Sequence, residues 1–90
     1  MSERTVELTN PSGLHARPAK VFAEAAARLD ATVTVRKGDR QVNAASVLSV
    51  LTLDCHQGDR ITIRAEGEGA EDAIDHLIAL VEEGLGEEPT

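Results

Sequence analysis

The stretch Arg60–Glu66, which reads RITIRAE, alternates apolar and polar side chains without a break. Side chains two positions apart on an extended chain lie on the same face, so Ile61, Ile63 and Ala65 would all point to one side. This pattern is the clearest strand signal in the chain. It predicts a sheet with one buried face and one polar face.

Further strands are expected on the N-terminal side of this stretch. Alternation predicts a strand over residues 3–9, which the turn formers at residues 10–13 would end. β-Branched residues predict a second strand over residues 32–36, and a turn over residues 37–39 leads into a third over residues 40–43. The second and third strands would form a hairpin, and the sheet would contain four strands.

Three segments show the spacing of helices. The long ones are predicted over residues 16–29 and 70–85, because apolar side chains recur three and four positions apart. Residues 46–53 predict a short helix, for which Ser46 would be the N-cap. Its apolar side chains point in too many directions for all of them to be buried, so some must face solvent or a partner. The apolar positions of the two long helices are Ala19, Phe22, Ala23 and Ala26, and Ile74, Leu77, Ile78, Val81 and Leu85.

The resulting order βαββαβα predicts an α+β fold, an open-faced two-layer sandwich with helices on one face of a four-stranded sheet. With one Phe and neither Trp nor Tyr, the core must consist of small aliphatic side chains. The chain of 90 residues suits a single domain over residues 1–88, and residues 89–90 are expected to be a frayed tail. The pattern alone does not fix the order of the strands.

The formal charge of −7 disfavours nucleic acids and anionic membranes as partners, since both are bound through clustered Lys and Arg. No apolar run is long enough to span a bilayer, and the first residues lack a signal peptide's apolar region. The single Cys55 cannot form an internal disulfide, which fits a reducing compartment. These features predict a cytoplasmic protein.

Candidate chemistry is concentrated in residues 13–19, which read GLHARPA. Pro18 suits the first turn of a helix, so backbone N–H groups near His15 would have no intrahelical acceptor. Free N–H groups, the positive end of the helix dipole and the guanidinium of Arg17 together favour an anion. A neutral imidazole in this place is a good nucleophile toward phosphorus.

The sequence shows no means of binding ATP, because it has neither a Walker A motif nor a kinase glycine loop. A phosphoryl group for His15 would therefore have to come from another molecule with its own machinery. We expect no cofactor. We also expect no metal site, since the neighbouring Cys55 and His56 provide only two potential ligands. We interpret these two residues as part of a surface loop.

The GLHARPA stretch resembles the active-site signature of HPr, the histidine phosphocarrier of the phosphoenolpyruvate-dependent sugar phosphotransferase system. The resemblance extends over residues 1–88. It implies an antiparallel sheet of order 1-4-2-3 and phosphorylation of His15 on Nδ1 by enzyme I, followed by transfer to IIA domains of sugar transporters. It further implies that Arg17 attends the phosphoryl group and that Ser12 and Ala16 form part of its cradle.

By the same resemblance, Ser46 matches a serine that a dedicated kinase phosphorylates in HPr proteins of many Gram-positive bacteria. The surroundings differ, because Ala45 stands where Lys is frequent and Asp54 stands where Gly is frequent. A docking surface for partners is expected where cationic and apolar side chains meet. Its members would be Lys20, Val47, Leu48 and Leu51.

Two alternatives remain open from the sequence. One is a regulatory HPr paralogue that acts mainly as a binding module in nitrogen or carbon control. The other is a small phosphohydrolase that uses His15 as nucleophile. A monomer is expected in each case, and the acidic pair Glu87-Glu88 is interpreted as aiding solubility.

Overall fold

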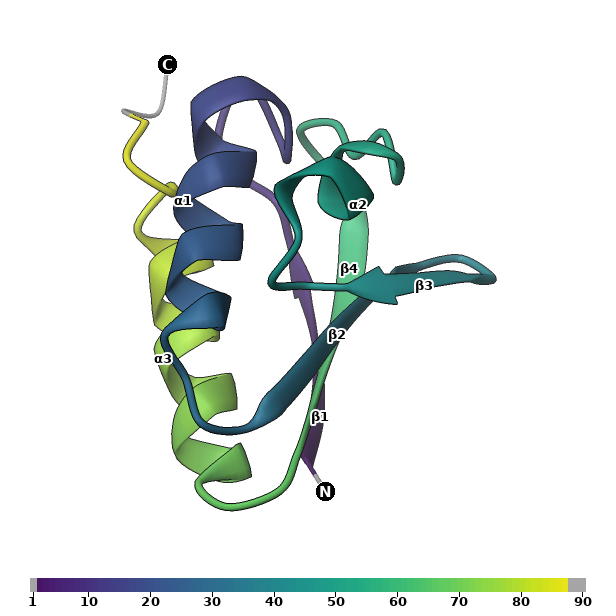
Figure 1. Cartoon of the computed structure of the whole chain (residues 1–90). Coiled ribbons are helices and arrows are strands. Elements are labelled where there is room, and N and C mark those ends of the chain that lie inside the picture. Colours follow the sequence, from purple (N-terminus) through teal and green to yellow (C-terminus); the bar gives the residue numbers. More distant parts are fainter. Residues whose placement is uncertain (1, 88–90) are drawn as a thin grey trace.

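The computed structural model describes residues 2–87. The chain forms four strands and three helices in the order that the sequence predicts (Figure 1). The strands are β1 (Ser2–Glu7), β2 (Thr32–Lys37), β3 (Arg40–Asn43) and β4 (Arg60–Glu66), and the helices are α1 (Ala16–Ala27), α2 (Val47–Leu51) and α3 (Ala70–Glu82).

The four strands form one antiparallel sheet of order β1-β4-β2-β3. Strand β4 lies inside the sheet, where Ile63 is opposite Arg4 of β1 on one side and Val35 of β2 on the other. The order 1-4-2-3 expected from the family resemblance is therefore confirmed. The alternating stretch that predicts the sheet is one of its two central strands.

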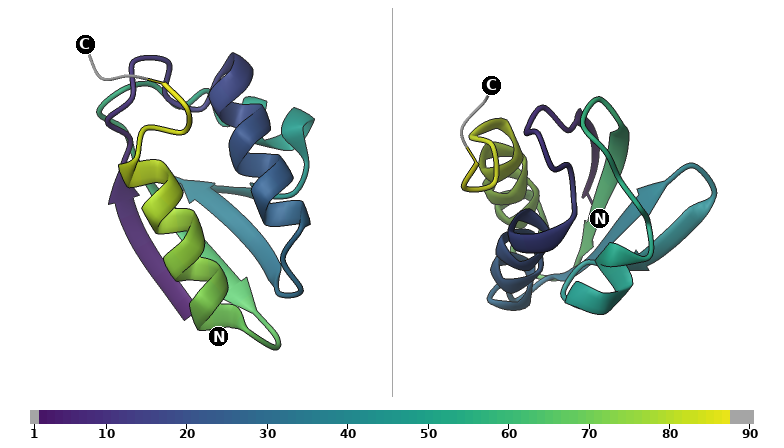
Figure 2. Two further views of the ribbon diagram at one scale, coloured as in Figure 1. Left: turned by 90° about the vertical axis from the view of Figure 1, so that its left-hand side faces the viewer. Right: turned by 90° about the horizontal axis from the view of Figure 1, so that it is seen from above.

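Helices α1 and α3 lie side by side against one face of the sheet, while the opposite face has no helix on it (Figures 1 and 2). The buried residues between the two layers are almost all small or aliphatic, and Phe22 at their centre is fully buried. The predicted inward positions of β4 and of both long helices are all buried: Ile61, Ile63, Ala65, Ala19, Phe22, Ala23, Ala26, Ile74, Leu77, Ile78, Val81 and Leu85.

The predicted bounds need correction where the chain leaves a regular element but stays in the core. Strand β1 ends at Glu7, because the next residue, Leu8, bonds instead to the turn before β4 through the carbonyl of Asp59 and the N–H of Gly58. Helix α3 ends at Glu82, yet Leu85 is fully buried with a positive φ of 52°. Because burial continues beyond the helix, the apolar pattern placed the predicted end of α3 at residue 85, later than its observed end at Glu82.

The loop before β4 differs from the prediction of a surface loop. Cys55 is fully buried among the core residues, whereas His56 beside it is exposed. Burial raises the pKa of the Cys55 thiol to about 11, so the thiol is protonated at neutral pH. Within residues 2–87, no helix has both the length and the apolar character that crossing a membrane requires.

Candidate functional site

The N-terminus of α1 places His15 at the edge of the molecule. His15 is the N-cap residue, with extended backbone angles, and its side chain is one-third exposed. The N–H groups of Ala16 and Arg17 donate to no acceptor within residues 2–87. Ala16 has a positive φ of 50°, and a left-handed residue followed by helical ones turns successive N–H groups toward a common anion. This geometry suits a phosphoryl group.

A second loop, residues 53–59, packs against the loop that contains His15. The N–H of Leu14 donates to the carbonyl of Cys55 at 3.1 Å. Gly13 has a φ of +58°, and a Cβ there would overlap the Cys55 carbonyl oxygen and lie 2.8 Å from the backbone of His56. Only glycine allows this close approach, so the two loops form one unit.

The second loop supplies the nearest charged neighbour of the His15 ring. Asp54 Oδ1 lies 2.9 Å from Nε2 of His15 and 3.2 Å from Nε2 of His56. The rings of the two histidines are 5.0 Å apart between centroids. On its other side, Nδ1 of His15 faces the carbonyl oxygen of Ser12 at 3.2 Å.

Both ring nitrogens of His15 thus face acceptor oxygens, but a neutral imidazole has only one N–H to donate. The carboxylate is the closer and stronger acceptor, which favours the proton on Nε2 and leaves the lone pair on Nδ1. Asp54 is ionised, because hydrogen bonds from His15 and His56 hold its pKa below the usual value. In this tautomer, Nδ1 is the ring nitrogen with a lone pair.

Asp54 itself is held in an unusual conformation. Its φ is +52°, and its carbonyl accepts a hydrogen bond of 2.9 Å from Nζ of Lys37. The same ammonium group also lies 3.0 Å from Oδ2 of Asp59, so Lys37 connects two residues of the second loop. Non-glycine residues with positive φ are uncommon and cluster at functional sites, and here Ala16 and Asp54 supply one in each loop.

Glu87 adds a contact that the sequence analysis did not predict. Its carboxylate accepts hydrogen bonds from the N–H of Ser12 at 2.9 Å, from Oγ of Ser12 at 2.7 Å and from Nδ2 of Asn10 at 2.9 Å. These donors, that of Asn10 first, lower the pKa of the Glu87 carboxyl. The interpretation of Glu87 as a solubility residue is therefore wrong, while Glu88 and the tail at residues 89–90 lie outside the described residues.

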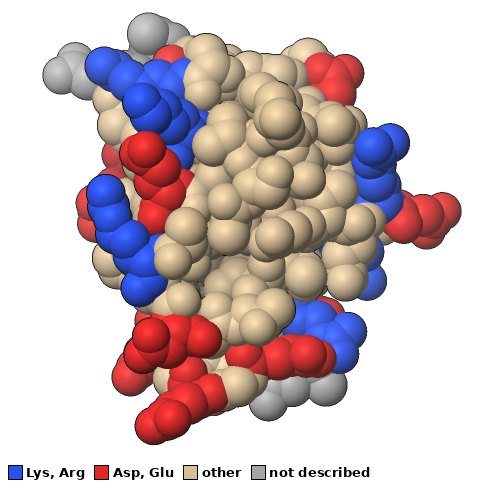
Figure 3. Space-filling view, viewed as in Figure 1, with Lys and Arg blue, Asp and Glu red and all other residues tan. Residues whose placement is uncertain are grey.

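Each predicted site residue has a defined place. Arg17 and Lys20 are exposed on α1, near His15. Leu48 is the exposed side chain of α2, with 78% of its surface accessible, while Val47 and Leu51 are partly buried and Val50 is in the core. In Figure 3 an uncharged surface lies over this part of the molecule, with Lys and Arg side chains at its edges. Ser12 is half-buried, and both its donors are bound to Glu87.

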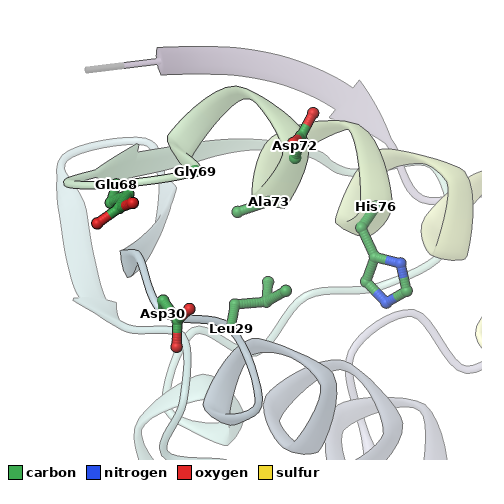
Figure 4. A pocket seen from close by; sticks show the side chains of 7 residues that line it. All are labelled: Leu29, Asp30, Glu68, Gly69, Asp72, Ala73 and His76. Atoms are coloured by element: carbon green, nitrogen blue, oxygen red, sulfur yellow. The ribbon is translucent and has the colours of Figure 1, made fainter.

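Ser46 is the N-cap of α2, as predicted, since its Oγ accepts a hydrogen bond of 3.2 Å from the N–H of Ser49. The third histidine, His76, lies on α3 and is exposed. It lines a depression between the end of α1 and the start of α3, at the opposite end of α1 from His15 (Figure 4). The acidic residues Asp30, Glu68 and Asp72 line the same depression, so it does not suit an anion.

Sequence reasoning missed the roles of Asp54, His56 and Glu87. One signal was present: Asp54 and His56 are two residues apart, a spacing that places both side chains on one side of an extended segment. Nothing local indicated Glu87, whose partners Asn10 and Ser12 are 77 and 75 residues away.

Comparisons with known proteins identify the family of the chain. The family model for the PTS HPr component phosphorylation site matches residues 2–83. Phosphocarrier protein HPr of Streptomyces coelicolor is 47% identical over 90 residues, covering 99% of this chain and 97% of the relative. Phosphocarrier protein NPr of Shewanella violacea is 41% identical over 80 residues, covering 89% of this chain and 88% of the relative.

Comparison with solved structures leads to the same family as comparison with sequences. The crystal structure of HPr-C-His from Thermoanaerobacter tengcongensis superposes with a TM-score of 0.94 at 40% identity. The match covers 98% of this chain and 99% of that one. The family model, the sequence identities and the superposition all lead to one conclusion. The chain belongs to the HPr family of phosphotransferase-system phosphocarriers, which carry a phosphoryl group and are not enzymes.

Proposed function

We propose that Nδ1 of His15 accepts a phosphoryl group from phosphorylated enzyme I and passes it to IIA components of sugar transporters. The observation that supports this most directly is the hydrogen bond between Nε2 of His15 and Asp54 at 2.9 Å. As the closer and stronger acceptor, the carboxylate favours the proton on Nε2, which leaves the lone pair on Nδ1. As the bond from Nδ1 to phosphorus forms, the bond from phosphorus to the donor breaks, and the donor group recovers its electron pair.

The N–H groups of Ala16 and Arg17 and the Arg17 guanidinium would bind the transferred phosphoryl oxygens. The donors of Ser12 are bound to Glu87, so Ser12 joins this cradle only if the carboxylate releases it. An exposed site with few cations stabilises the phosphohistidine without trapping it, as a carrier requires. We infer that the protein works as a cytoplasmic carrier and that the domain spans residues 1–88.

The decisive test is ³¹P NMR of the purified protein with phosphoenolpyruvate and catalytic enzyme I. We expect a phosphohistidine signal that requires enzyme I, disappears when a IIA domain is added and is absent from His15→Ala. His76→Ala is the matched control, because it removes an exposed histidine at the far end of α1 and should leave the signal unchanged. A normal signal from folded His15→Ala would refute the proposal.

For docking, we propose that Lys20 and the α2 side chains Val47, Leu48 and Leu51 contact enzyme I and IIA domains. Truncating an exposed contact residue should weaken binding by about fivefold or more while changing stability by less than about 0.5 kcal/mol. Leu48→Ala is the suitable variant because Leu48 is 78% exposed. Unchanged affinity for enzyme I in isothermal titration calorimetry would place the docking surface elsewhere.

Ser46 is proposed as a regulatory phosphorylation site for a serine kinase. A phosphate on its Oγ would add negative charge next to Val47 and Leu48 and so oppose docking on an acidic partner. Mass spectrometry of protein from native cells should detect a Ser46 phosphopeptide that disappears when the kinase is deleted. Its steady absence in sugar-rich medium would contradict this role.

Membership of a carrier family decides against the small phosphohydrolase, but a regulatory paralogue remains a second candidate. This second candidate is supported by the relative named phosphocarrier protein NPr, which is 41% identical to this chain. A panel of purified IIA domains would separate the two, since the sugar carrier should phosphorylate IIA domains of sugar transporters. We propose that the protein is a monomer. Light scattering would test this, and the test matters because a dimer of Thermoanaerobacter tengcongensis HPr is among the similar solved structures.

A further inference from the structure

The two loops bring together three potential metal ligands, of which His56 has no part in the proposed phosphoryl transfer. Within residues 2–87, His15, Asp54 and His56 form the only group of three His, Cys, Asp or Glu side chains placed to hold a metal ion. Their potential ligand atoms all lie within 4.8 Å of one another. Asp54 Oδ1 stands between the two Nε2 atoms, at 2.9 Å and 3.2 Å.

These separations are close to those on a metal ion. Imidazole nitrogens bind Zn²⁺ at about 2.0–2.1 Å and carboxylate oxygens at about 2.0–2.2 Å, so neighbouring ligand atoms of a tetrahedral ion are about 3.4 Å apart. The two distances from Asp54 Oδ1 are slightly shorter than this value, so the carboxylate needs to move outward only a little. The side chains of Asp54 and His56 are 73% and 63% exposed, so an ion can reach them and they can adjust.

We propose that His15, Asp54 and His56 bind a divalent transition-metal ion such as Zn²⁺ through two Nε2 atoms and one carboxylate oxygen, with water completing the coordination. Two imidazoles among three ligands favour zinc, nickel or copper over magnesium and calcium, which prefer oxygen ligands. This proposal differs from the expectation of no metal site, which considered only the adjacent Cys55 and His56.

The charges around the cluster permit a cation. Asp54 supplies a negative charge at its centre, and the net charge of the chain is −7. The ammonium of Lys37 is engaged by the Asp54 carbonyl and the Asp59 carboxylate. The N-terminus of α1 opposes a cation, but direct bonds from two imidazoles and a carboxylate outweigh this partial charge.

Metal binding and phosphorylation would exclude each other at His15, because a neutral imidazole bound through Nε2 carries its proton on Nδ1, where it would donate to the Ser12 carbonyl. The metal site can nevertheless be tested without any phosphoryl transfer. Its test is a Zn²⁺ titration of the purified, metal-free protein, followed by calorimetry and by ¹⁵N NMR of the imidazole nitrogens. We expect a single ion per chain and shifts of the Nε2 signals of His15 and His56, without a shift for His76. No enzyme I is needed, so failure of the carrier function would leave this result intact.

Two variants make the assignment specific. His56→Gln removes an exposed ligand and should weaken zinc binding by at least about tenfold. His76→Gln is the matched control and should leave the affinity unchanged. No binding at millimolar zinc, equal binding by His56→Gln, or loss of binding in His76→Gln would each overturn the proposal.

Discussion

The two loops that meet at His15 differ in what they contribute. Residues 10–17 contain the HPr signature with His15 and Arg17, and the N–H groups of Ala16 and Arg17 bind no acceptor within residues 2–87. Residues 53–59 depart from the family pattern at Asp54 and supply the carboxylate and second imidazole beside the ring. In the proposed function, the first loop therefore supplies the reacting atom, whereas the second loop sets the position of the proton on the ring.

The largest effect should come from separating the two loops. In Gly13→Ala, the new Cβ would overlap backbone atoms of Cys55 and His56, and φ at +58° is itself unfavourable. We expect a loss of about 3 kcal/mol or more in the free energy of unfolding. Gly38→Ala is the matched control, because its φ is +60° but nothing lies within 4 Å. It should cost only about 1 kcal/mol in urea denaturation; equal losses in both variants would argue against the interlocked loops.

Arg17→Ala tests the first loop alone. Charge-assisted hydrogen bonds contribute about 1.5–3 kcal/mol, so removing the guanidinium should slow phosphorylation of His15 about tenfold or more. Rapid-quench measurement with phosphorylated enzyme I would give the rate. Arg28→Ala, at the exposed C-cap of the same helix, should leave the rate unchanged. A similar decrease in both variants would mean that general charge, and not the position of Arg17, matters.

Asp54→Gly tests the second loop alone, and glycine suits the φ of +52° at this position. Without the carboxylate, the neutral His15 ring should lose its preference for the proton on Nε2. Long-range ¹H–¹⁵N spectra of the metal-free protein would show this as a change in tautomer populations for His15 but not for His76. Identical His15 spectra in the two proteins would show that Asp54 does not set the tautomer.

The smallest effect is expected from Glu87, which holds the first loop from the other side. Its carboxyl pKa is below the usual 4.5 in the folded protein, so the charge stabilises the fold at neutral pH and this contribution is lost as the pH falls through the folded value. Glu87→Gln should lower Tm slightly at neutral pH, and the difference should shrink as the pH is lowered from 4.5 through the folded value. A Tm difference that persists in acid would assign the effect to packing.

Local sequence patterns predicted the elements well because each depends on neighbours in the chain. The alternation in β4 and the stripe in α3 both correspond to buried side chains, and the N-cap Ser46 bonds within its own first turn. The strand order came from the family resemblance, since periodicity does not encode which strands pair. Leu85 shows the limit of the pattern, because burial continued after the helix had ended.

The candidate site was predictable only in its first half. His15 and Arg17 lie in one short motif, so the turn and the helix start could be predicted together. Asp54 lies 39 residues from His15, and Glu87 lies 75 residues from Ser12. Their contacts arise when the sheet brings distant loops to one end of the molecule, and no local spacing indicates them.

The close contact at Gly13 also has a consequence for how the sequence can change over generations. Because Gly13 and Leu14 rest on the backbone of Cys55 and His56, an insertion or deletion in either loop would move the other. We expect natural relatives to exchange side chains freely at positions 54 and 56 while keeping both loop lengths constant. Under this constraint, the chemistry around His15 would change through substitutions and not through changes of loop length.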